Sequence, residues 1–405
     1  MKKSLLIAAL AVFTMASCSK DEVIDVKQDA ISFNVVAENT TKAAELFCSY
    51  NYMNSFKVYA DFNTPTADPT VAKYIDGDQI NVAANGTCST PVTRYWPELD
   101  GGKSLTFYAI AGTATSIDNS RTAGSVPTLT DYTVSNTNVG EHEDLLYSVN
   151  AENTNKNAAV HLNFRHALSL IQFRAKNTNT KLHVVIEDVM VGNVASAGKF
   201  SFPATTTGTS AFEEHADDSG DDYAGNDSDI NCWSNQGTNI NYTIAAGATT
   251  PAEWSEKVIT GDGTVVNLTY VASHTGSTDF ETAFNRSMLL IPQVTTANTA
   301  TSGSFNGSYL AVNCRIYNIA GTSYDLATDV LLHEGWAIIP VAFDWKPGNK
   351  YVYTFVFGEG NGGTDGGNDL DPKPGTDPVL FPISYTLTID DFDFISDANI
   401  DMKQE

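Results

Sequence analysis

The side chains that could carry chemistry include seven histidines, some of which lie beside acids. His142 in the stretch GEHED and His333 in LLHEGW each neighbour a glutamate, a pairing that acid–base catalysis can use. Neither has a second histidine or a cysteine at the spacing of a metal site. His161, His166 and His183 lie in stretches of strand-like residues, where sheet positions are the simpler interpretation. The histidines therefore predict no catalytic residue and no metal ligand.

The densest group of acids is the stretch FEEHADDSGDDYAGNDSD, residues 212–229. Its carboxylates could offer oxygen ligands to Ca²⁺, but the spacing fits no EF-hand loop and lacks the closing glutamate of that loop. We interpret it as a solvated acidic loop. Metalloprotease, nucleophile-elbow, phosphate-loop and dinucleotide-binding motifs are also missing from the sequence. We therefore expect no enzyme and no cofactor.

Cys18 is the strongest candidate for a covalent modification. Two lysines precede an unbroken apolar run at residues 5–13, and two small residues stand directly before Cys18. This order resembles a secretory signal that ends in a lipobox, so we predict removal of residues 1–17 and acylation of Cys18, palmitate included. The alternative is a cleaved signal with an incidental cysteine. The sequence SKDE that begins at residue 19 resembles a signal for the outer face of the outer membrane.

Composition limits the class of protein. A length of 405 residues exceeds one ordinary domain, so two are expected. The excess of 48 acids over 23 bases gives a net charge of −25, which argues against nucleic acid as a partner because phosphates require a basic surface. Abundant Thr, Asn, Ser and Gly favour strands over helices. The remaining cysteines are widely spaced, and both disulfides and buried thiols stay open for them: Cys48, Cys88, Cys232 and Cys314.

Alternation of apolar and polar residues dominates the chain. In the first such segment, residues 31–36, the side chains of Ile31, Phe33 and Val35 share one face. No window of helix length carries a helical apolar stripe, so we predict an all-β fold of β-sandwiches. Further strands are expected at residues 55–62, 104–112, 160–164, 168–175, 182–191, 265–271, 288–291, 309–317 and 351–357.

Two segments rich in turn residues suggest the joints between domains. The polar residues 150–158 separate an N-terminal domain, 43–155, from a C-terminal domain, 156–357. Residues 358–378 are rich in Gly, Asp and Pro, and such a composition is typical of a flexible linker.

The most regular alternation in the chain follows this linker. A bulge or bend is expected near Asp390 or Asp391, because Phe392 and Phe394 fall on the other phase of the pattern. This strand could be the last of its own domain, or it could complete the sheet of a neighbouring subunit. In the second case each buried side chain contributes about 1.5–3 kcal/mol before ordering costs, and main-chain pairing adds to this. The six apolar residues are Val379, Phe381, Ile383, Tyr385, Leu387 and Ile389.

Several stretches in a fixed order resemble the fimbrillin-like family of Gram-negative anaerobes. They are RYWP with LTFYAIAG (94–97 and 105–112), DLLYS (144–148), NFRHALSLIQFRAKN (163–177), LLIPQ (289–293) and WKPGNKYVYTF (345–355). The resemblance implies a subunit or accessory protein of a type V pilus with two tandem transthyretin-like β-sandwich domains. In that family a trypsin-like protease removes the first strand after a basic residue, and the vacated groove accepts the C-terminal strand of another subunit.

The resemblance assigns a role to each end of this chain. Residues 18–42 would be a propeptide that carries the removable strand, Lys42 the cleavage site and residues 379–405 the donor strand. Family members often have arginine at the cleavage position, so Lys42 is a departure. One cut there would remove the lipid and the strand together. The implied partners are other pilus subunits, in a homo- or heteropolymer, and an adhesion ligand on a host or bacterial surface. The implied location is the outer membrane before processing and the fimbrium after it.

A second hypothesis is a surface-exposed glycan-binding lipoprotein, in which tryptophan rings would form stacking platforms. Core positions are expected for Trp96 and Trp345 because they lie in strand-like motifs. Trp233 lies in the polar stretch NCWSNQ and is expected to be the most exposed, and the other candidates are Trp254 and Trp336.

Overall fold

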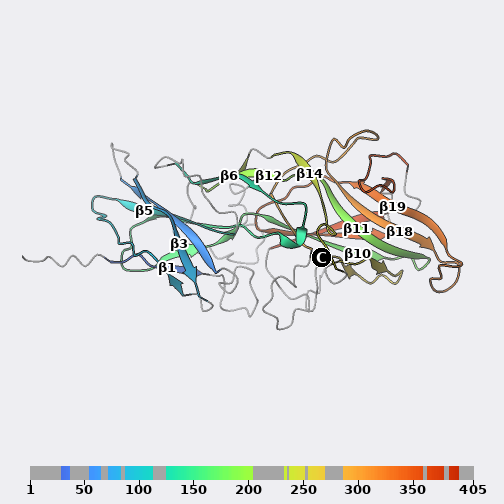
Figure 1. Cartoon of the computed structure of the whole chain (residues 1–405), viewed down its shortest axis with the longest axis horizontal. Coiled ribbons are helices and arrows are strands. Elements are labelled where there is room, and N and C mark those ends of the chain that lie inside the picture. The colour runs from blue at the N-terminus through green and yellow to red at the C-terminus, as the bar shows by residue number, and fades with distance from the viewer. Residues whose placement is uncertain are drawn as a thin grey trace, which may run out of the picture.

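The computed structural model describes residues 29–36, 54–64, 72–83, 87–112, 125–203, 232–234, 237–250, 254–269, 286–358, 363–377 and 383–391. Within them the secondary structure is β-strand apart from one short 3-10 turn, η1 (Val139–Glu141), which confirms the predicted all-β class. The molecule is elongated, with β1, β3 and β5 towards one end and β18 and β19 towards the other (Figure 1). The described residues contain no helix with the length and hydropathy needed to span a bilayer.

The N-terminal half is built on one antiparallel sheet. Its strands are β2 (Ser55–Asn63), β3 (Ala72–Val82), β4 (Cys88–Ser89), β5 (Ser104–Ala111), β7 (Leu146–Asn153) and β9 (Arg165–His166). Their order across the sheet is β4-β3-β2-β5-β7-β9. A parallel pair, β1 (Phe33–Val36) with β8 (Val160–Asn163), packs against one face of this sheet.

The central strand β5 is buried on both faces, and all eight residues of SLTFYAIA are shielded from water. Phe107 and Ala109 belong to the core shared with β1 and β8. Tyr108 and Ile110 point the other way, into a larger core that continues into the C-terminal half. On that side the Tyr108 ring contacts the Phe202 ring, at 5.6 Å between centroids. This face lies against a small sheet of β6 (Thr128–Thr133), β12 (Ala197–Ser201) and β13 (Trp233–Ser234).

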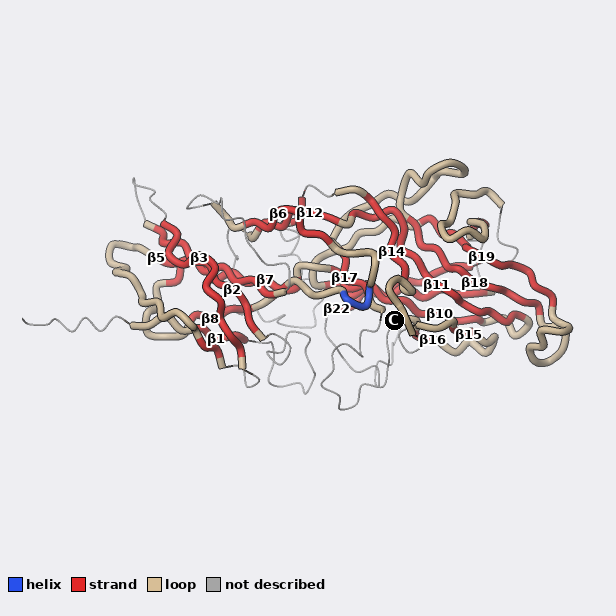
Figure 2. The backbone as a smooth tube through the Cα atoms, viewed as in Figure 1, coloured by secondary structure: helices blue, strands red, loops and turns tan. Residues whose placement is uncertain are grey.

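The C-terminal half contains two facing sheets (Figure 2). The first comprises β14 (Asn239–Thr243), β11 (Leu182–Ala195), β18 (Tyr309–Asn318), β19 (Val330–Pro340) and β21 (Thr364–Asp365), with β15 (Lys257–Ile259) on β11. The second comprises β16 (Val266–Asn267), β10 (Ser169–Asn177), β20 (Asn349–Phe357) and β22 (Ile383–Asp391), with β17 (Met288–Leu290) on β10.

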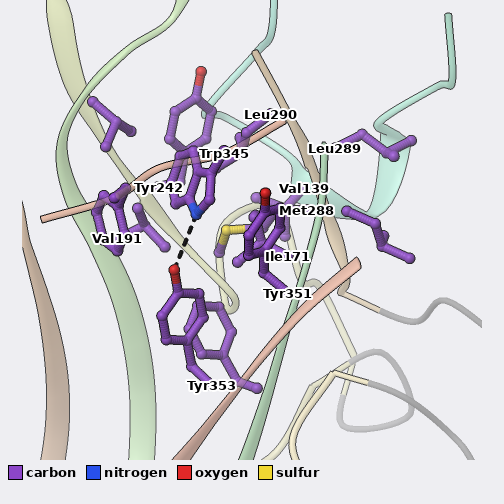
Figure 3. Close-up of a cluster of buried hydrophobic side chains, with 14 of the residues drawn as sticks. Val139, Ile171, Val191, Tyr242, Met288, Leu289, Leu290, Trp345, Tyr351 and Tyr353 are labelled. Carbon is purple, nitrogen blue, oxygen red and sulfur yellow. Dashed lines mark hydrogen bonds between the residues drawn. The ribbon is translucent and has the colours of Figure 1, made fainter. Parts of the chain in front are cut away.

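Aromatic side chains fill the space between these sheets (Figure 3). Trp345 is fully buried, and its Nε1–H donates to the Tyr353 hydroxyl at 3.0 Å. Burying an indole is favourable only if its N–H finds a partner, and the tyrosine provides one. Tyr242 and Val191, from the other sheet, reach the same cluster. The WKPGNKYVYTF stretch therefore supplies much of this core.

The boundary between the two halves does not coincide with the polar residues 150–158. Val160, Leu162 and Phe164 lie beyond that segment, yet their side chains are buried in the N-terminal core. β9 then pairs with β7 and closes the N-terminal sheet. We therefore propose that the N-terminal unit extends to His166, about ten residues further than the sequence pattern suggests.

Candidate functional site

The first described strand, β1, has main-chain partners on both sides. On one side it runs parallel to β8, with Phe33 opposite Val160, and the Val160 N–H donates to the Ser32 carbonyl at 2.8 Å. On the other side Asn34 forms an antiparallel bridge with Thr87, and just before the strand the Ile31 N–H donates to the Arg94 carbonyl at 2.8 Å. β1 is therefore inserted between two neighbours and is not added at a free edge.

The side chains of Phe33 in β1 and of Ile31 just before it complete the N-terminal core. Ile31 is 3% exposed and Phe33 is 9% exposed. The Phe33 ring meets the Phe56 and Phe107 rings edge-on, with centroids 6.4 and 5.9 Å apart. Burial of such side chains contributes roughly 1.5–3 kcal/mol each. Val35 pairs through its backbone with residue 162, but its side chain lies outside the described part.

Residues 94–95, which lie beside β1, are joined to β3 by contacts that do not involve β1. Arg94 binds Asp78 of β3 with two nitrogens, Nε at 2.6 Å and Nη2 at 3.0 Å. The Tyr74 hydroxyl donates to the Tyr95 carbonyl at 2.5 Å. A bidentate guanidinium–carboxylate pair fixes both distance and orientation. The 94–95 segment would therefore keep its position against β3 if β1 were absent. These two elements would then form the walls of the groove that β1 now fills.

At the other end of the chain, β22 lies at an edge of the second C-terminal sheet. It pairs antiparallel with β20 over its whole length, from Ile383 opposite Phe357 to Asp391 opposite Asn349. The register has no interruption as far as Asp391, the last described residue of the strand. Phe392 and Phe394, where the phase of the pattern shifts, lie outside the described residues, so the bend expected near Asp390 or Asp391 stays a prediction. In the single chain, then, the C-terminal strand packs on its own domain.

This packing covers the apolar face of β22 only in part. Ile383 is fully buried, Tyr385 is half-buried and Leu387 is 42% exposed. Tyr385 and Leu387 border an open hollow of about 370 Å³ whose other walls include Tyr351 and Lys346. An apolar side chain at an edge strand beside open space gains little from burial. The remaining predicted donor residues lie outside the described side chains: Val379, Phe381 and Ile389.

The two residues predicted to be modified, Cys18 and Lys42, lie outside the described residues. The acidic stretch 212–229 also lies outside them. Their roles therefore stay predictions. Within the described ranges, no three His, Cys, Asp or Glu side chains gather closely enough to hold a metal ion.

Part of the segment expected to be a linker packs on the protein body. Thr364 and Asp365, which form β21, pair with β19. Pro372 and Pro374 are buried. The expectation of a flexible linker is therefore wrong for residues 363–377, because a Pro-rich segment can bury its rings on a preformed sheet without a core of its own.

His142 makes one of the contacts between the two halves of the chain. Its Nδ1 accepts a hydrogen bond from the Leu289 N–H at 3.1 Å, and its Nε2–H donates to the Ser135 carbonyl at 2.7 Å. Burial lowers the pKa of His142 to about 4, so the ring is neutral near pH 7. Both nitrogens are used in this structural contact, which leaves none for catalysis.

A buried pair that the sequence did not indicate lies at the base of the N-terminal sheet. His166 Nδ1 is 2.5 Å from Asp144 Oδ2, and both side chains are about one-tenth exposed. The two residues stand 22 positions apart, and they meet because β9 pairs with β7. Both belong to motifs that carry the family resemblance, DLLYS and NFRHALS, but nothing in their spacing predicts the contact.

The tryptophans do not form exposed platforms. Trp233, expected to be the most exposed, is 7% exposed, and its Nε1–H donates to the Ala167 carbonyl at 2.7 Å. Its polar neighbours in NCWSNQ misled the prediction, because β13 pairs with β12 and turns the ring into an aromatic cluster. Trp254 is half-buried under Lys257, and the rest are buried: Trp96, Trp336 and Trp345. The glycan-binding hypothesis loses the platforms on which it depended.

Comparisons with known proteins identify a family and similar structures. A family model described as fimbrillin-like matches residues 50–369. The structure of a fimbrial protein from Bacteroides vulgatus ATCC 8482 is similar, with a TM-score of 0.54 and 14% identity over 90% of this chain and 99% of that chain. Candidate cell adhesion proteins from Bacteroides eggerthii DSM 20697 (TM-score 0.42, 12% identity, 90% and 96% covered) and Parabacteroides distasonis ATCC 8503 (0.43, 12%, 90% and 98%) also match. No curated protein matches the chain.

Proposed function

Because the chain belongs to the fimbrillin-like family, as its sequence motifs predicted, we propose that it is a structural subunit of cell-surface fimbriae. We further propose that it polymerises by donor-strand exchange after a protease has removed β1. The observation that carries this proposal is the position of β1, which is inserted between β8 and the 94–96 segment and fills the N-terminal core.

Loss of β1 would create an acceptor site. The groups on β8 and at Arg94 that now pair with β1 would lose their partners, and the Phe56 and Phe107 rings would face water. A bare sheet edge beside an apolar groove favours pairing with another strand. The Arg94–Asp78 pair would keep the walls in place while the groove is empty.

The C-terminal strand has the properties of a donor. Its apolar face alternates regularly, yet among its described side chains Ile383 alone is fully buried in its own domain. Transfer into a closed groove would bury Leu387 as well, which contributes a fraction of about 1.5–3 kcal/mol. It would also surround the strand with partners on both sides, as β1 is surrounded now, whereas on its own sheet it pairs with β20 alone.

The remaining steps of the proposal concern delivery and processing. Acylation of Cys18 would hold the precursor in the outer membrane, and a cut after Lys42 would release lipid and β1 together. Other pilus subunits would be the partners, and adhesion to a host or bacterial surface the outcome. Since trypsin-like proteases accept lysine as well as arginine, the departure at Lys42 is compatible with cleavage.

Limited digestion of the purified protein with trypsin tests the proposal. The expected products are a new N-terminus at Ala43 and a ladder of SDS-resistant oligomers. The Lys42→Gln variant is the matched control and should keep β1 and stay monomeric. A cut protein that remains monomeric at high concentration would contradict strand exchange.

A further inference from the structure

Residues 363–377, which we term the strap, bind tightly to the edge strand β19. The Gly366 N–H donates to the Trp336 carbonyl at 2.7 Å, and the Trp336 N–H donates to the Gly367 carbonyl at 3.0 Å. The indole Nε1–H of Trp336 donates to the Asp369 carbonyl at 3.0 Å. One tryptophan thus binds three points of the strap through main chain and side chain.

The strap packs against a separate apolar cluster on this sheet. Glycines allow the close approach: a Cβ on Gly366 would lie 2.8 Å from the Ile338 side chain, and a Cβ on Gly335 would lie 2.6 Å from the Gly367 carbonyl. Gly335 also has a φ of +120°, which other residues rarely adopt. Removing the strap would uncover part of a cluster formed by Met190, Tyr309, Ala311, Trp336 and Ile338.

The strap is also closed on itself, so its end has a fixed place. The Asp365 N–H donates to the Asp377 carbonyl at 2.7 Å, and the Lys373 N–H donates to the Gly366 carbonyl at 3.0 Å. Six Cα–Cα steps separate Asp377 from Ile383, a reach of at most about 23 Å. A released strap would instead give β22 a reach of roughly 90 Å from the end of β20.

We infer that the strap stays on its own domain in the polymer and that a second copy of the chain docks against it. This inference rests on the proposed strand exchange. Release of the strap would break its hydrogen bonds and expose Trp336, whereas departure of β22 would break its pairing with β20 and leave the strap in place. A short tether also raises the effective concentration of the donor. The acceptor groove of the second copy must then lie within about 23 Å of Asp377.

Leu370 is the contact that the strap offers to this second copy. It is 94% exposed, more than any other large apolar side chain among the described residues. In the loop that presents it, Asp369 and Lys373 form an ion pair and the Asp369 carbonyl accepts the Trp336 indole N–H. Beside β1, the acceptor unit exposes two apolar side chains of its own, Val92 at 49% and Tyr95 at 44%. Interface hot spots are often apolar side chains that pack against apolar groups of the partner. Leu370 against Val92 and Tyr95 of the second copy would fit this pattern.

A disulfide lock tests whether the strap stays docked. Ala337 and Asp365 are directly opposite in the pairing of β19 with β21, so Ala337→Cys with Asp365→Cys can be oxidised to fix the strap. The same variant in its reduced form is the control, as is the natural chain under both conditions. After trypsin treatment, the oxidised form should assemble within about twofold of the reduced form. Assembly of the reduced form alone would overturn the inference.

Substitution of the anchor tests the contact. Leu370→Ser should slow assembly of the cut protein by about tenfold or more. Leu326→Ser is the matched control, because Leu326 is 68% exposed in the loop between β18 and β19, and it should assemble at the normal rate. Equal rates for the two variants would overturn the inference. Failure of the natural chain itself to assemble would instead contradict the proposed function, so the two failures are distinguishable.

Discussion

The strands at the two ends of the chain have similar patterns but opposite situations. β1 carries Phe33, with Ile31 just before it, is enclosed by partners on both sides and fills a core. β22 carries a longer apolar face, yet it lies at an edge, has one partner and leaves Leu387 42% exposed. The strand with the shorter apolar face, β1, is therefore the one that is enclosed, and the strand with the longer apolar face, β22, is partly exposed.

This difference teaches how the direction of exchange is set. An enclosed strand loses many contacts when it leaves, so β1 is held until the chain beyond it is cut. An edge strand loses one ladder of hydrogen bonds and little buried area, so β22 can leave without a cut. Under the proposed exchange, release of β1 would create a site that accommodates β22 better, and the unequal burial of the two strands would drive the exchange.

The largest expected effect comes from deletion of residues 379–405. The deletion removes the donor, so assembly of the trypsin-cut protein should be abolished. The monomer should stay folded, because β22 is an edge strand and its removal leaves both C-terminal sheets in place. Oligomer ladders on SDS gels and far-UV circular dichroism measure the two outcomes. Oligomer ladders of normal length from the truncated chain would show that β22 is not the donor strand.

Truncation of the enclosed strand should destabilise the N-terminal half. Phe33→Ala deletes a ring that packs on Phe56 and Phe107, so the free energy of unfolding should fall by about 3–5 kcal/mol. Urea unfolding followed by the fluorescence of Trp96, which contacts Phe107, measures this. Asn34→Ala, at an exposed position of the same strand, is the control and should change little. A comparably small loss for Phe33→Ala would show that β1 is not a core strand.

The sequence predicted the strands with unbroken alternation and missed those interrupted by special backbone. Residues 104–112 and 309–317 were predicted, and they match β5 and β18 closely. β3 was not predicted, because the Asp-Gly-Asp at residues 76–78 resembles a turn. In the structure Gly77 has a φ of +88° within a β-bulge, and the strand continues on both sides.

Features of the candidate site that depend on contacts between distant segments could not be predicted from the sequence. The removable strand and its apolar face are local features, so residues 31–36 could be identified from alternation alone. The docking of residues 363–377 depends on Trp336 and Gly335 of β19, and both are distant in sequence from the segment that they hold. The burial of Trp233 depends likewise on β12. Local composition therefore misassigned both the linker and the exposed ring.

A pH effect tests whether the two halves form one body. His142 has a pKa near 4 in the folded chain and about 6.5 when unfolded, so the unfolded state binds more protons between these values. Stability should therefore fall as the pH drops from 6.5 to 4, by about 1–2 kcal/mol for this half-buried ring. His142→Gln should flatten the dependence in urea unfolding measured at several pH values. An unchanged slope would mean that His142 does not link the halves.

Asp188 acts in the opposite sense over part of the same range. Burial raises its pKa to about 6, so the folded state binds the extra proton and stability is lost as the pH rises from 3.8 through 6. Asp188→Asn should therefore steepen the acid-side loss caused by His142. This variant, measured in the same series, separates the two titrations.

The smallest effect on the monomer is expected at the edge strand. Leu387→Ala removes a side chain that is 42% exposed, so the free energy of unfolding should change by no more than about 0.5 kcal/mol. In the proposed polymer the same side chain would be buried, so the temperature at which the oligomer ladder dissociates in SDS should fall. Measuring both quantities on one variant compares the surroundings of Leu387 in the monomer with those in the polymer. Equal sensitivity of monomer and polymer would contradict it.

The central claim is that the C-terminal strand of one chain takes the place of β1 in another. It is tested most directly by adding a synthetic peptide of residues 379–391 to a chain that lacks 379–405. Size-exclusion chromatography with mass spectrometry then follows the fragment that ends at Lys42. The account predicts that the peptide binds the trypsin-cut chain in a one-to-one complex and displaces this fragment. Binding of the peptide while the fragment stays in place would contradict the account.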